Sequence, residues 1–215
     1  MKLSIGNTSL ELLPDHGVLL EDRTLVVSDL HLGKATAFQA KGLAVPEGDT
    51  EADLTRLLNL CHETQAKHLI INGDLFHSPA GIPPEMEKLL HFWIEKLAIR
   101  IELVIGNHED KFKKLPDGLS PARSIDRAGF HLVHDPADAP ADKPAICGHW
   151  HPVARIADGK RTSLRLPCFL QRGEMLVLPS YGTFTGGRII DLQSSDRVFV
   201  APGSRITEVP QLLLR

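Results

Sequence analysis

Four hydrophobic segments of the 215-residue chain each end in a turn that carries carboxylate, amide or imidazole side chains. The turns are Ser-Asp-Leu-His at 28–31, Asn-Gly-Asp at 72–74, Gly-Asn-His at 106–108 and Gly-His-Trp-His at 148–151. Each residue alone has an ordinary explanation, since Asp and Asn form turns and His occurs in protein cores. Together they indicate one common site, because ligands of open α/β sheets bind outside the carboxyl ends of the strands.

Strands and helices alternate in the first half of the sequence. The continuously apolar run around Val26 predicts a strand buried on both faces, and similar runs follow at 68–72 and 101–105. Apolar residues spaced three and four apart predict one amphipathic helix from Asp49 and another that begins at Pro83-Pro84. This alternation implies parallel strands joined by right-handed crossovers.

The second half of the sequence consists of closely spaced short strands with turns and no strong helix. We expect antiparallel additions or a second sheet there, and a surface loop over residues 135–144. No repeat or linker divides the chain, so we expect a single domain, residues 1–215. A hydrophobic fraction of 42% is enough to form a full core in a chain of this length.

Composition narrows the protein class. The N-terminus lacks the apolar block of a signal peptide, and no apolar run is long enough to span a bilayer. The three cysteines are far apart, which favours neither a disulfide framework nor a thiolate zinc site, and a reducing cytoplasm is the expected location. The formal charge of −3 argues against a broad basic footprint of the kind found on sequence-reading DNA-binding domains.

The residue types at the four turns suit a metal centre. Oxygen and nitrogen ligands without thiolates are typical of sites for Mn²⁺, Fe²⁺ or Zn²⁺, and the set is too rich in imidazole for a dedicated Mg²⁺ or Ca²⁺ site. In an extended segment His149 and His151 would point the same way with Cα atoms about 7 Å apart, so they can converge on one ion or on two neighbouring ions. Asp74, on a sharp turn after Gly73, can give one oxygen to each of two ions about 3.5–4 Å apart. The sequence therefore predicts Asp74 as a bridging ligand.

The ordered motifs Asp29-x-His31, Gly73-Asp74, Gly106-Asn107-His108 and Gly148-His149-x-His151 resemble the signature of the calcineurin-like metallophosphoesterases. The resemblance implies a four-layer α/β/β/α sandwich of two mixed β-sheets flanked by helices, and a metal-dependent hydrolase of phosphoric esters. It also implies two divalent ions, manganese before iron or zinc, and a catalytic acid at His108. The implied ligands of one ion are Asp29, His31 and His151, those of the other are Asn107, His134 and His149, and Asp74 bridges the two.

The ligand position assigned to His134 departs from the family pattern. Relatives usually have a histidine followed by glycine there, whereas this chain has two histidines, His131 and His134, and an aspartate after the second. We favour His134, because it lies at the end of the predicted strand, where the other candidate ligands lie.

Stretches that flank the motifs are similar to a narrower branch, the ligase-associated DNA-damage-response phosphoesterases. They are SDLHLGKATAFQAKGLAVPEGD, GDLFHS, PCFL and LPSYGTFTGG. This similarity implies a phosphodiesterase that cuts DNA in a repair context, with a DNA ligase or helicase as partner and no membrane partner. The sequence leaves open DNA or RNA, endonuclease or exonuclease action, and a monomer or homo-oligomer. Alternatives are a small-molecule or nucleotide phosphodiesterase, a phosphomonoesterase, and a non-catalytic scaffold, although the filled ligand positions argue against the last.

Substrate contacts are predicted next to the motifs. Lys111, Lys113 and Lys114 follow the third motif and Lys34 follows the first, so these lysines are candidates for contact with a nucleic-acid backbone. Trp150 lies between two motif histidines and is a candidate for stacking on a base or sugar. The alternatives are that the lysines are solvated surface and that Trp150 packs against a neighbouring loop.

Overall fold

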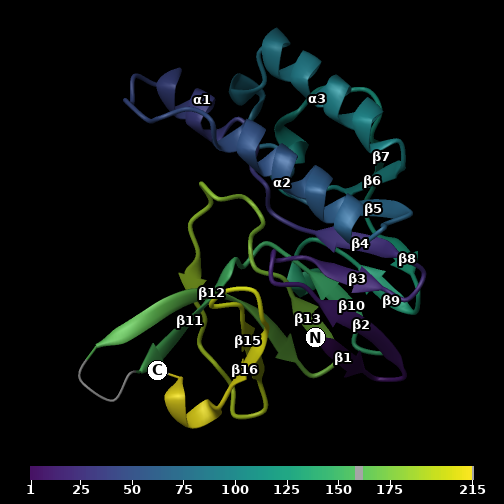
Figure 1. The fold of residues 1–215 in the computed structure, drawn as a ribbon, viewed down its shortest axis with the longest axis vertical. Coiled ribbons are helices and arrows are strands. Elements are labelled where there is room, and N and C mark those ends of the chain that lie inside the picture. The colour runs from purple at the N-terminus through teal and green to yellow at the C-terminus, as the bar shows by residue number, and fades with distance from the viewer. Residues whose placement is uncertain (158–161, 215) are drawn as a thin grey trace.

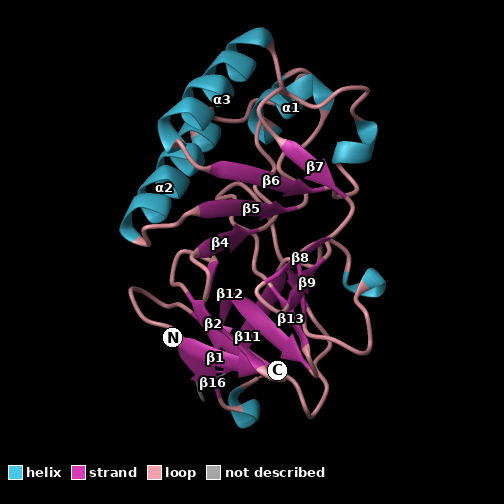
Figure 2. Ribbon diagram, turned by 90° about the vertical axis from the view of Figure 1, so that its right-hand side faces the viewer, coloured by secondary structure: helices cyan, strands magenta, loops and turns pink. Residues whose placement is uncertain are grey.

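Two β-sheets pack face to face in the computed structural model, which describes residues 1–157 and 162–214 (Figure 1). The two long α-helices, Asp49–Glu63 and Pro84–Leu97, lie against the first sheet, beside β5 (His68–Asn72) and β6 (Arg100–Val104), and the second sheet lies on the opposite side (Figure 2). This arrangement confirms the predicted α/β sandwich of two mixed sheets with flanking helices. Among the described residues no α-helix follows Leu97, so the outer face of the second sheet lacks the helical layer expected of a four-layer sandwich. None of the helices in the described part of the chain has the length and apolar character needed to cross a bilayer.

The first sheet follows the order of the chain. Its strands are β1 (Lys2–Ile5), β2 (Thr8–Leu12), β3 (Val18–Leu20), β4 (Thr24–Val27), β5, β6 and β7 (Ser120–Ala122). The strands from β1 to β4 pair antiparallel, and those from β4 to β7 pair parallel. The parallel part agrees with the predicted crossovers, because parallel neighbours need a long connection, usually a helix.

The crossover helices cover one face of this sheet. Helix α2 (Asp49–Glu63) connects β4 to β5 and α3 (Pro84–Leu97) connects β5 to β6, each beginning where the sequence predicts it. They pack on each other, and Trp93 Nε1 donates a hydrogen bond of 2.8 Å to Leu54 O. A short helix, α1 (Lys34–Gln39), and a 3₁₀ turn, η1 (Pro79–Gly81), follow β4 and β5 respectively. Neither short element was predicted.

The second sheet is mixed. Its strands are β8 (Ile125–Arg127), β9 (Phe130–Leu132), β10 (Ala145–Cys147), β11 (Pro152–Ala157), β12 (Ser163–Arg172), β13 (Met175–Val177), β14 (Arg188–Ile189), β15 (Arg197–Val200) and β16 (Thr207–Val209). Strand β10 lies parallel to β9 and β13, whereas β12 pairs antiparallel with β11, β13 and β15. Among the described residues this half contains 3₁₀ turns and no α-helix, as predicted. The 3₁₀ turns after η1 are η2 (Glu109–Lys111), η3 (Pro136–Asp138) and η4 (Gln211–Leu213).

Alternate side chains of the central strands enter two different cores. Val27 and Ile71 contact the helices, whereas Val26 and Ile70 contact the second sheet, where Phe169 belongs to the same cluster. Both faces of β4 and β5 are therefore dry, which explains why their sequences are continuously apolar instead of alternating.

Strand ends of the two sheets meet at one edge of the sandwich. Asp29 N donates to Gly73 O at 3.1 Å, which joins the turns after β4 and β5. Buried Asn72, at the end of β5, donates from Nδ2 to Val133 O and Ile146 O of the second sheet, both at 3.1 Å. These bonds bring the turns after β4 and β5 next to the segments around residues 133 and 146 of the second sheet.

Candidate metal centre

Candidate ligands at this edge adopt an unusual backbone conformation. The φ angles are +59° for Asp29, +51° for His31, +51° for Asp74, +66° for His149 and +45° for His151. Left-handed backbone at non-glycine residues costs on the order of 1–3 kcal/mol each and occurs preferentially at functional sites. The turns therefore orient these five side chains toward the candidate site at a cost in local backbone stability.

One cluster consists of Asp29, His31 and His151, whose ligand atoms lie within 4.8 Å of one another. The Asp29 side chain is fully buried, and its Oδ1 lies 2.9 Å from His151 Nε2. His151 Nε2 in turn lies 3.4 Å from His31 Nε2. Two ring nitrogens that face each other beside a carboxylate form an arrangement that a shared cation would stabilise.

A second cluster consists of Asp74, His134 and His149, again within 4.8 Å. His134 Nε2 lies 3.4 Å from Asp74 Oδ2, and the same oxygen lies 3.8 Å from His31 Nε2 of the first cluster. One oxygen of Asp74 thus lies between the two clusters. This is the position that a bridging ligand requires.

Backbone carbonyls fix the orientation of two imidazoles. His134 Nδ1 lies 2.8 Å from Asn72 O, and His151 Nδ1 lies 3.0 Å from Gly186 O. A carbonyl only accepts, so each Nδ1 carries the proton, and the Nε2 of each neutral ring keeps a free lone pair directed at the cluster. Within the described part of the chain His134 Nε2 is buried without a well-aligned hydrogen bond. These donors fit a divalent transition-metal ion.

Protonation of the side chains is consistent with a cation site. Burial alone would raise the pKa of Asp74, but the neighbouring His134 imidazole and the His108 amide hold that pKa well below its ordinary value. Burial lowers the pKa of His31 to about 3, despite the opposing effect of Asp74 and Asp29. Burial would also lower the pKa of His134, but the two carboxylates raise it to about 9. The clusters therefore favour positive charge next to Asp74.

Two motif glycines provide space for this arrangement. Gly73 has a φ of +86°, and a Cβ added to it would lie 2.1 Å from His134 Nδ1. A Cβ on Gly148 would lie 1.9 Å from Ser28 Oγ, whose hydroxyl donates to Asp29 Oδ2 at 2.7 Å. Any side chain at either position would displace a candidate ligand or its hydrogen-bond partner.

The structure distinguishes between the two competing histidines. His131 Nδ1 pairs with Asp126 Oδ1 at 2.8 Å and lies outside both clusters, whereas His134 belongs to the second cluster. Asn107 is exposed and lines a cavity of about 390 Å³ together with both His131 and His134. Membership of the second cluster, and not the cavity, therefore separates the two histidines.

His108 lies beside the clusters with a fixed ring. Its backbone amide donates to Asp74 Oδ1 at 2.9 Å, and its Nδ1 lies 2.5 Å from His77 O. The Nδ1 atom must therefore carry a proton, and Nε2 lies 3.9 Å from Asp74 Oδ2. The ring nitrogen nearer the clusters is the one available for proton transfer.

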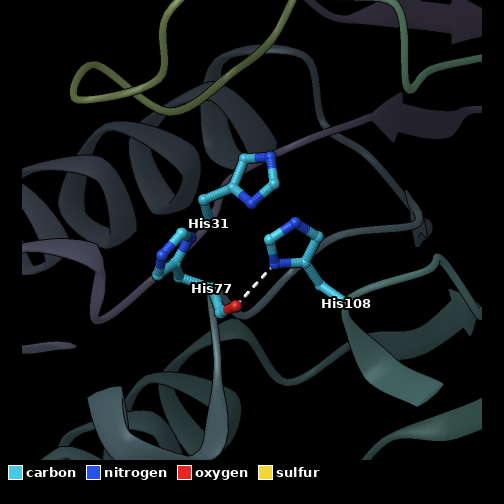
Figure 3. A group of neighbouring side chains, drawn as sticks. All are labelled: His31, His77 and His108. Carbon is cyan, nitrogen blue, oxygen red and sulfur yellow. Dashed lines mark hydrogen bonds between the residues drawn. The ribbon is translucent and has the colours of Figure 1, made fainter. Parts of the chain in front are cut away.

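His77 is not among the site residues predicted from the sequence, yet it lies next to two of them. Its ring converges with those of His31 and His108, and the ligand atoms of all three lie within 4.8 Å (Figure 3). Burial and the nearby positive charges of His108 and Lys34 lower the pKa of His77 to about 4. The available signal was its position in the turn region that follows β5, three residues after Asp74 and next to Phe76, which pairs with Leu32.

Glu109 was also missed. It is 3% exposed, and its carboxylate accepts three amide hydrogen bonds. Asp74 N and Gly106 N donate to Oε2 at 2.9 and 3.0 Å, and Phe76 N donates to Oε1 at 3.1 Å. Burial raises the pKa of Glu109, and these amides act in the opposite direction. One side chain thus joins the turns that follow β5 and β6.

The predicted substrate contacts lie in different surroundings. Lys111, Lys113 and Lys114 are exposed after the third motif, and Lys114 pairs with Asp117 at 3.0 Å. Lys34 is half-buried on α1.

Trp150 is half-buried and packs against the hydrophobic cluster on the outer side of the second sheet. The Arg172 guanidinium lies 5.6 Å from the centroid of its ring. This matches the alternative in which Trp150 packs against neighbouring elements, and we do not propose it as a base platform.

A two-sheet α/β sandwich with Asp and His clusters at its strand ends defines the class of metal-dependent phosphoesterases. The family model for calcineurin-like phosphoesterases matches residues 22–169, and the chain belongs to that family. It is therefore a metal-dependent hydrolase of phosphoester bonds.

Solved structures extend the comparison to the whole chain. The nuclease MPE from Pseudomonas putida is similar over 97% of this chain and 99% of its own, with 29% sequence identity and a TM-score of 0.82. The phosphoesterase YfcE from E. coli matches 86% of this chain and 97% of its own, with 19% identity and a TM-score of 0.44. Comparison with curated proteins gives no match.

Proposed function

We propose that the chain is a dinuclear-metal phosphodiesterase that cleaves nucleic acid, with DNA as its substrate. The observation that carries the proposal is the position of Asp74 Oδ2, 3.4 Å from His134 Nε2 and 3.8 Å from His31 Nε2, between two clusters of ligand residues. Similarity to a nuclease along nearly the full length of both chains supports nucleic acid as the substrate class.

The proposed ligands divide between the two sheets. Asp29, His31 and His151 would hold one ion, Asn107, His134 and His149 would hold the other, and Asp74 would be shared. Two such ions, manganese by preference and otherwise iron or zinc, would polarise a phosphate and supply a hydroxide at neutral pH. The absence of thiolates among the ligands supports manganese over a structural zinc site.

His108 is the proposed catalytic acid. Its Nδ1–H donates to His77 O, so the ring is held with Nε2 toward Asp74. When the ring is doubly protonated, transfer of the Nε2 proton to the departing oxygen leaves the neutral tautomer that the His77 carbonyl already stabilises. The carbonyl therefore orients the acid and fixes the nitrogen from which the proton leaves.

Surface lysines are the proposed contacts to the rest of the polymer. Exposed Lys111, Lys113 and Lys114, together with Lys34, would bind phosphates outside the scissile one. We keep a single domain, a cytoplasmic location, a DNA ligase or helicase partner and a homo-oligomer as proposals. The cytoplasmic location is supported by Cys61, Cys147 and Cys168, which are buried and free.

Metal content and turnover test the proposal together. We expect chelator-treated protein to take up about two Mn²⁺ ions per chain by elemental analysis after reloading. Asp74→Asn should lose metal and activity together, whereas His108→Ala should lower kcat with metal retained.

Three results would argue against parts of this assignment. Saturation at one ion would exclude the dinuclear centre. Loss of metal in His108→Ala equal to that in Asp74→Asn would make His108 a ligand. Hydrolysis of a small aryl phosphomonoester without any cleavage of oligonucleotides or of an aryl phosphodiester would replace the nuclease with a phosphomonoesterase.

A further inference from the structure

We propose that Phe184, Phe38 and Lys34 form a subsite that stacks one nucleobase beside the scissile phosphate. The inference rests on the proposed nuclease function and deepens it, since it names the part of the nucleotide that is bound outside the metal centre. None of the four strand-end motifs contains these three residues.

A row of aromatic contacts leads from the metal centre to the surface. Ring centroids lie 5.2 Å apart for His108 and His77, 5.5 Å apart for His77 and Phe38, and 6.1 Å apart for Phe38 and Phe184. Phe38 meets both neighbours edge to face. The row begins at the proposed acid and ends at Phe184, whose side chain is 38% exposed. A partly exposed aromatic ring therefore lies at the surface end of this row, three ring contacts from the proposed acid.

The segment that carries Phe184 is fixed to the metal centre by hydrogen bonds. Gly182 N donates to Asp29 O at 3.1 Å, and His151 Nδ1 donates to Gly186 O at 3.0 Å. Phe184 thus lies between two bonds to candidate ligands of the same ion. A shift of this segment would therefore also move Asp29 or His151, the candidate ligands to which it is hydrogen-bonded.

A buried carboxylate anchors the residue before Phe184. Asp53 of α2 is 2% exposed, and its Oδ2 accepts from Thr183 N at 2.9 Å and from Thr183 Oγ1 at 3.2 Å. The exposed ring therefore stands on a rigid segment, so binding a base would require little additional ordering of the protein.

Lys34 supplies a positive charge that can pair with the phosphate of a bound nucleotide. Its Nζ lies 5.6 Å from the Phe184 centroid and 6.0 Å from the Phe38 centroid. Within the described part of the chain Lys34 forms no ion pair within 4.0 Å; burial lowers its pKa, and the nearby Asp49 carboxylate acts in the opposite direction. A cation next to an exposed ring matches a phosphate and its base, the repeating unit of a nucleic acid.

The chain offers a matched control on another element. Phe92 of α3 is 55% exposed, and Lys96 Nζ lies 4.6 Å from its ring centroid. The pair reproduces the exposed ring and the cation, but α3 carries no candidate metal ligand. Removal of this ring reports the effect of losing a surface phenylalanine alone.

The experiment is a double-mutant cycle in which the protein is changed at Phe184 and the substrate is changed at one nucleobase. Cleavage of a fluorescent single-stranded oligonucleotide is measured for the Mn²⁺-loaded wild type, Phe184→Ala, Phe184→Trp and Phe92→Ala, after confirming equal melting temperatures. The same enzymes are tested on oligonucleotides in which a tetrahydrofuran abasic residue replaces the nucleotide on either side of the cleaved bond.

We expect Phe184→Ala to raise KM on the normal oligonucleotide about 5- to 100-fold, with Phe184→Trp close to wild type and Phe92→Ala unchanged. One abasic substrate should raise the wild-type KM by a similar factor and abolish the difference between wild type and Phe184→Ala. That substrate identifies the side on which the base is bound.

Two results would overturn the subsite. One is a wild-type KM for Phe184→Ala, and the other is an equal loss on normal and abasic substrates. In both cases the wild type still cleaves DNA, so the proposed function stands. Absence of oligonucleotide cleavage by metal-loaded wild type that hydrolyses a small phosphodiester would overturn the nuclease proposal and the subsite together.

Discussion

Replacing Glu109 with Gln tests whether one buried carboxylate holds the turns after β5 and β6 together. The wild-type carboxylate accepts from Asp74 N, Gly106 N and Phe76 N. Glutamine has a single carbonyl oxygen. In its better orientation it keeps the two bonds made by Oε2 and turns its NH₂ group against the Phe76 amide.

The expected change in the free energy of unfolding follows from this loss of one hydrogen-bond acceptor. A buried amide left without a partner costs about 1–3 kcal/mol. Removing a buried negative charge acts in the opposite direction, since burial raises the pKa of Glu109. We therefore expect the free energy of unfolding to fall by about 1–3 kcal/mol, which corresponds to a Tm lower by roughly 2–12 °C in a chain of this size.

Urea unfolding followed by circular dichroism, in the presence of a chelator, measures this effect without a contribution from metal. The matched control is Asp110→Asn, which changes the neighbouring residue by the same charge. Asp110 is exposed and pairs with Arg123 at 3.0 Å, so its replacement should cost less than about 1 kcal/mol. Equal unfolding free energies for the two variants would refute the role assigned to Glu109.

Two further predictions concern ligands and substrate contacts. His134→Ala should bind about one Mn²⁺ ion less per chain than wild type, whereas His131→Ala should keep both; the opposite pattern in elemental analysis would exchange their roles. Changing Lys111, Lys113 and Lys114 to Glu should raise KM for single-stranded DNA strongly at low salt. It should also reduce the slope of log affinity against log salt by about 2, with far less effect on a small phosphodiester. Unchanged cleavage across a salt series would leave these lysines as solvated surface.

Much of the candidate site could be predicted because its residues are constrained locally. Asp29, Asp74 and His149 each lie in a turn directly after a strand, beside glycines that leave space for them, so residue type and position carry the signal together. The helices α2 and α3 could also be predicted from the sequence, because an apolar stripe repeated over several turns identifies a helix face.

Other features depend on contacts between distant segments. Helix α1 spans six residues, too few for a periodic pattern, and its start depends on close backbone contact between Gly33 and Gly81. Glu109 stands in an Asp- and Lys-rich stretch that suggests exposed surface, and it is buried only because η2 folds back toward β5. The same holds for His77, because its neighbours His31 and His108 come from the turns after β4 and β6, whereas His77 itself follows β5.

Asn72 joins the two sheets by hydrogen bonds, and the proposed ligands are divided between the same two sheets. Metal supply should therefore affect how fast the protein is degraded in the cell. The first sheet provides Asp29, His31, Asp74 and Asn107, and the second provides His134, His149 and His151. On this ligand set, each ion at 100 times its Kd would stabilise the closed sandwich by about 2.7 kcal/mol. A cell short of metal would then hold a looser form of the protein, and proteases would remove that form first.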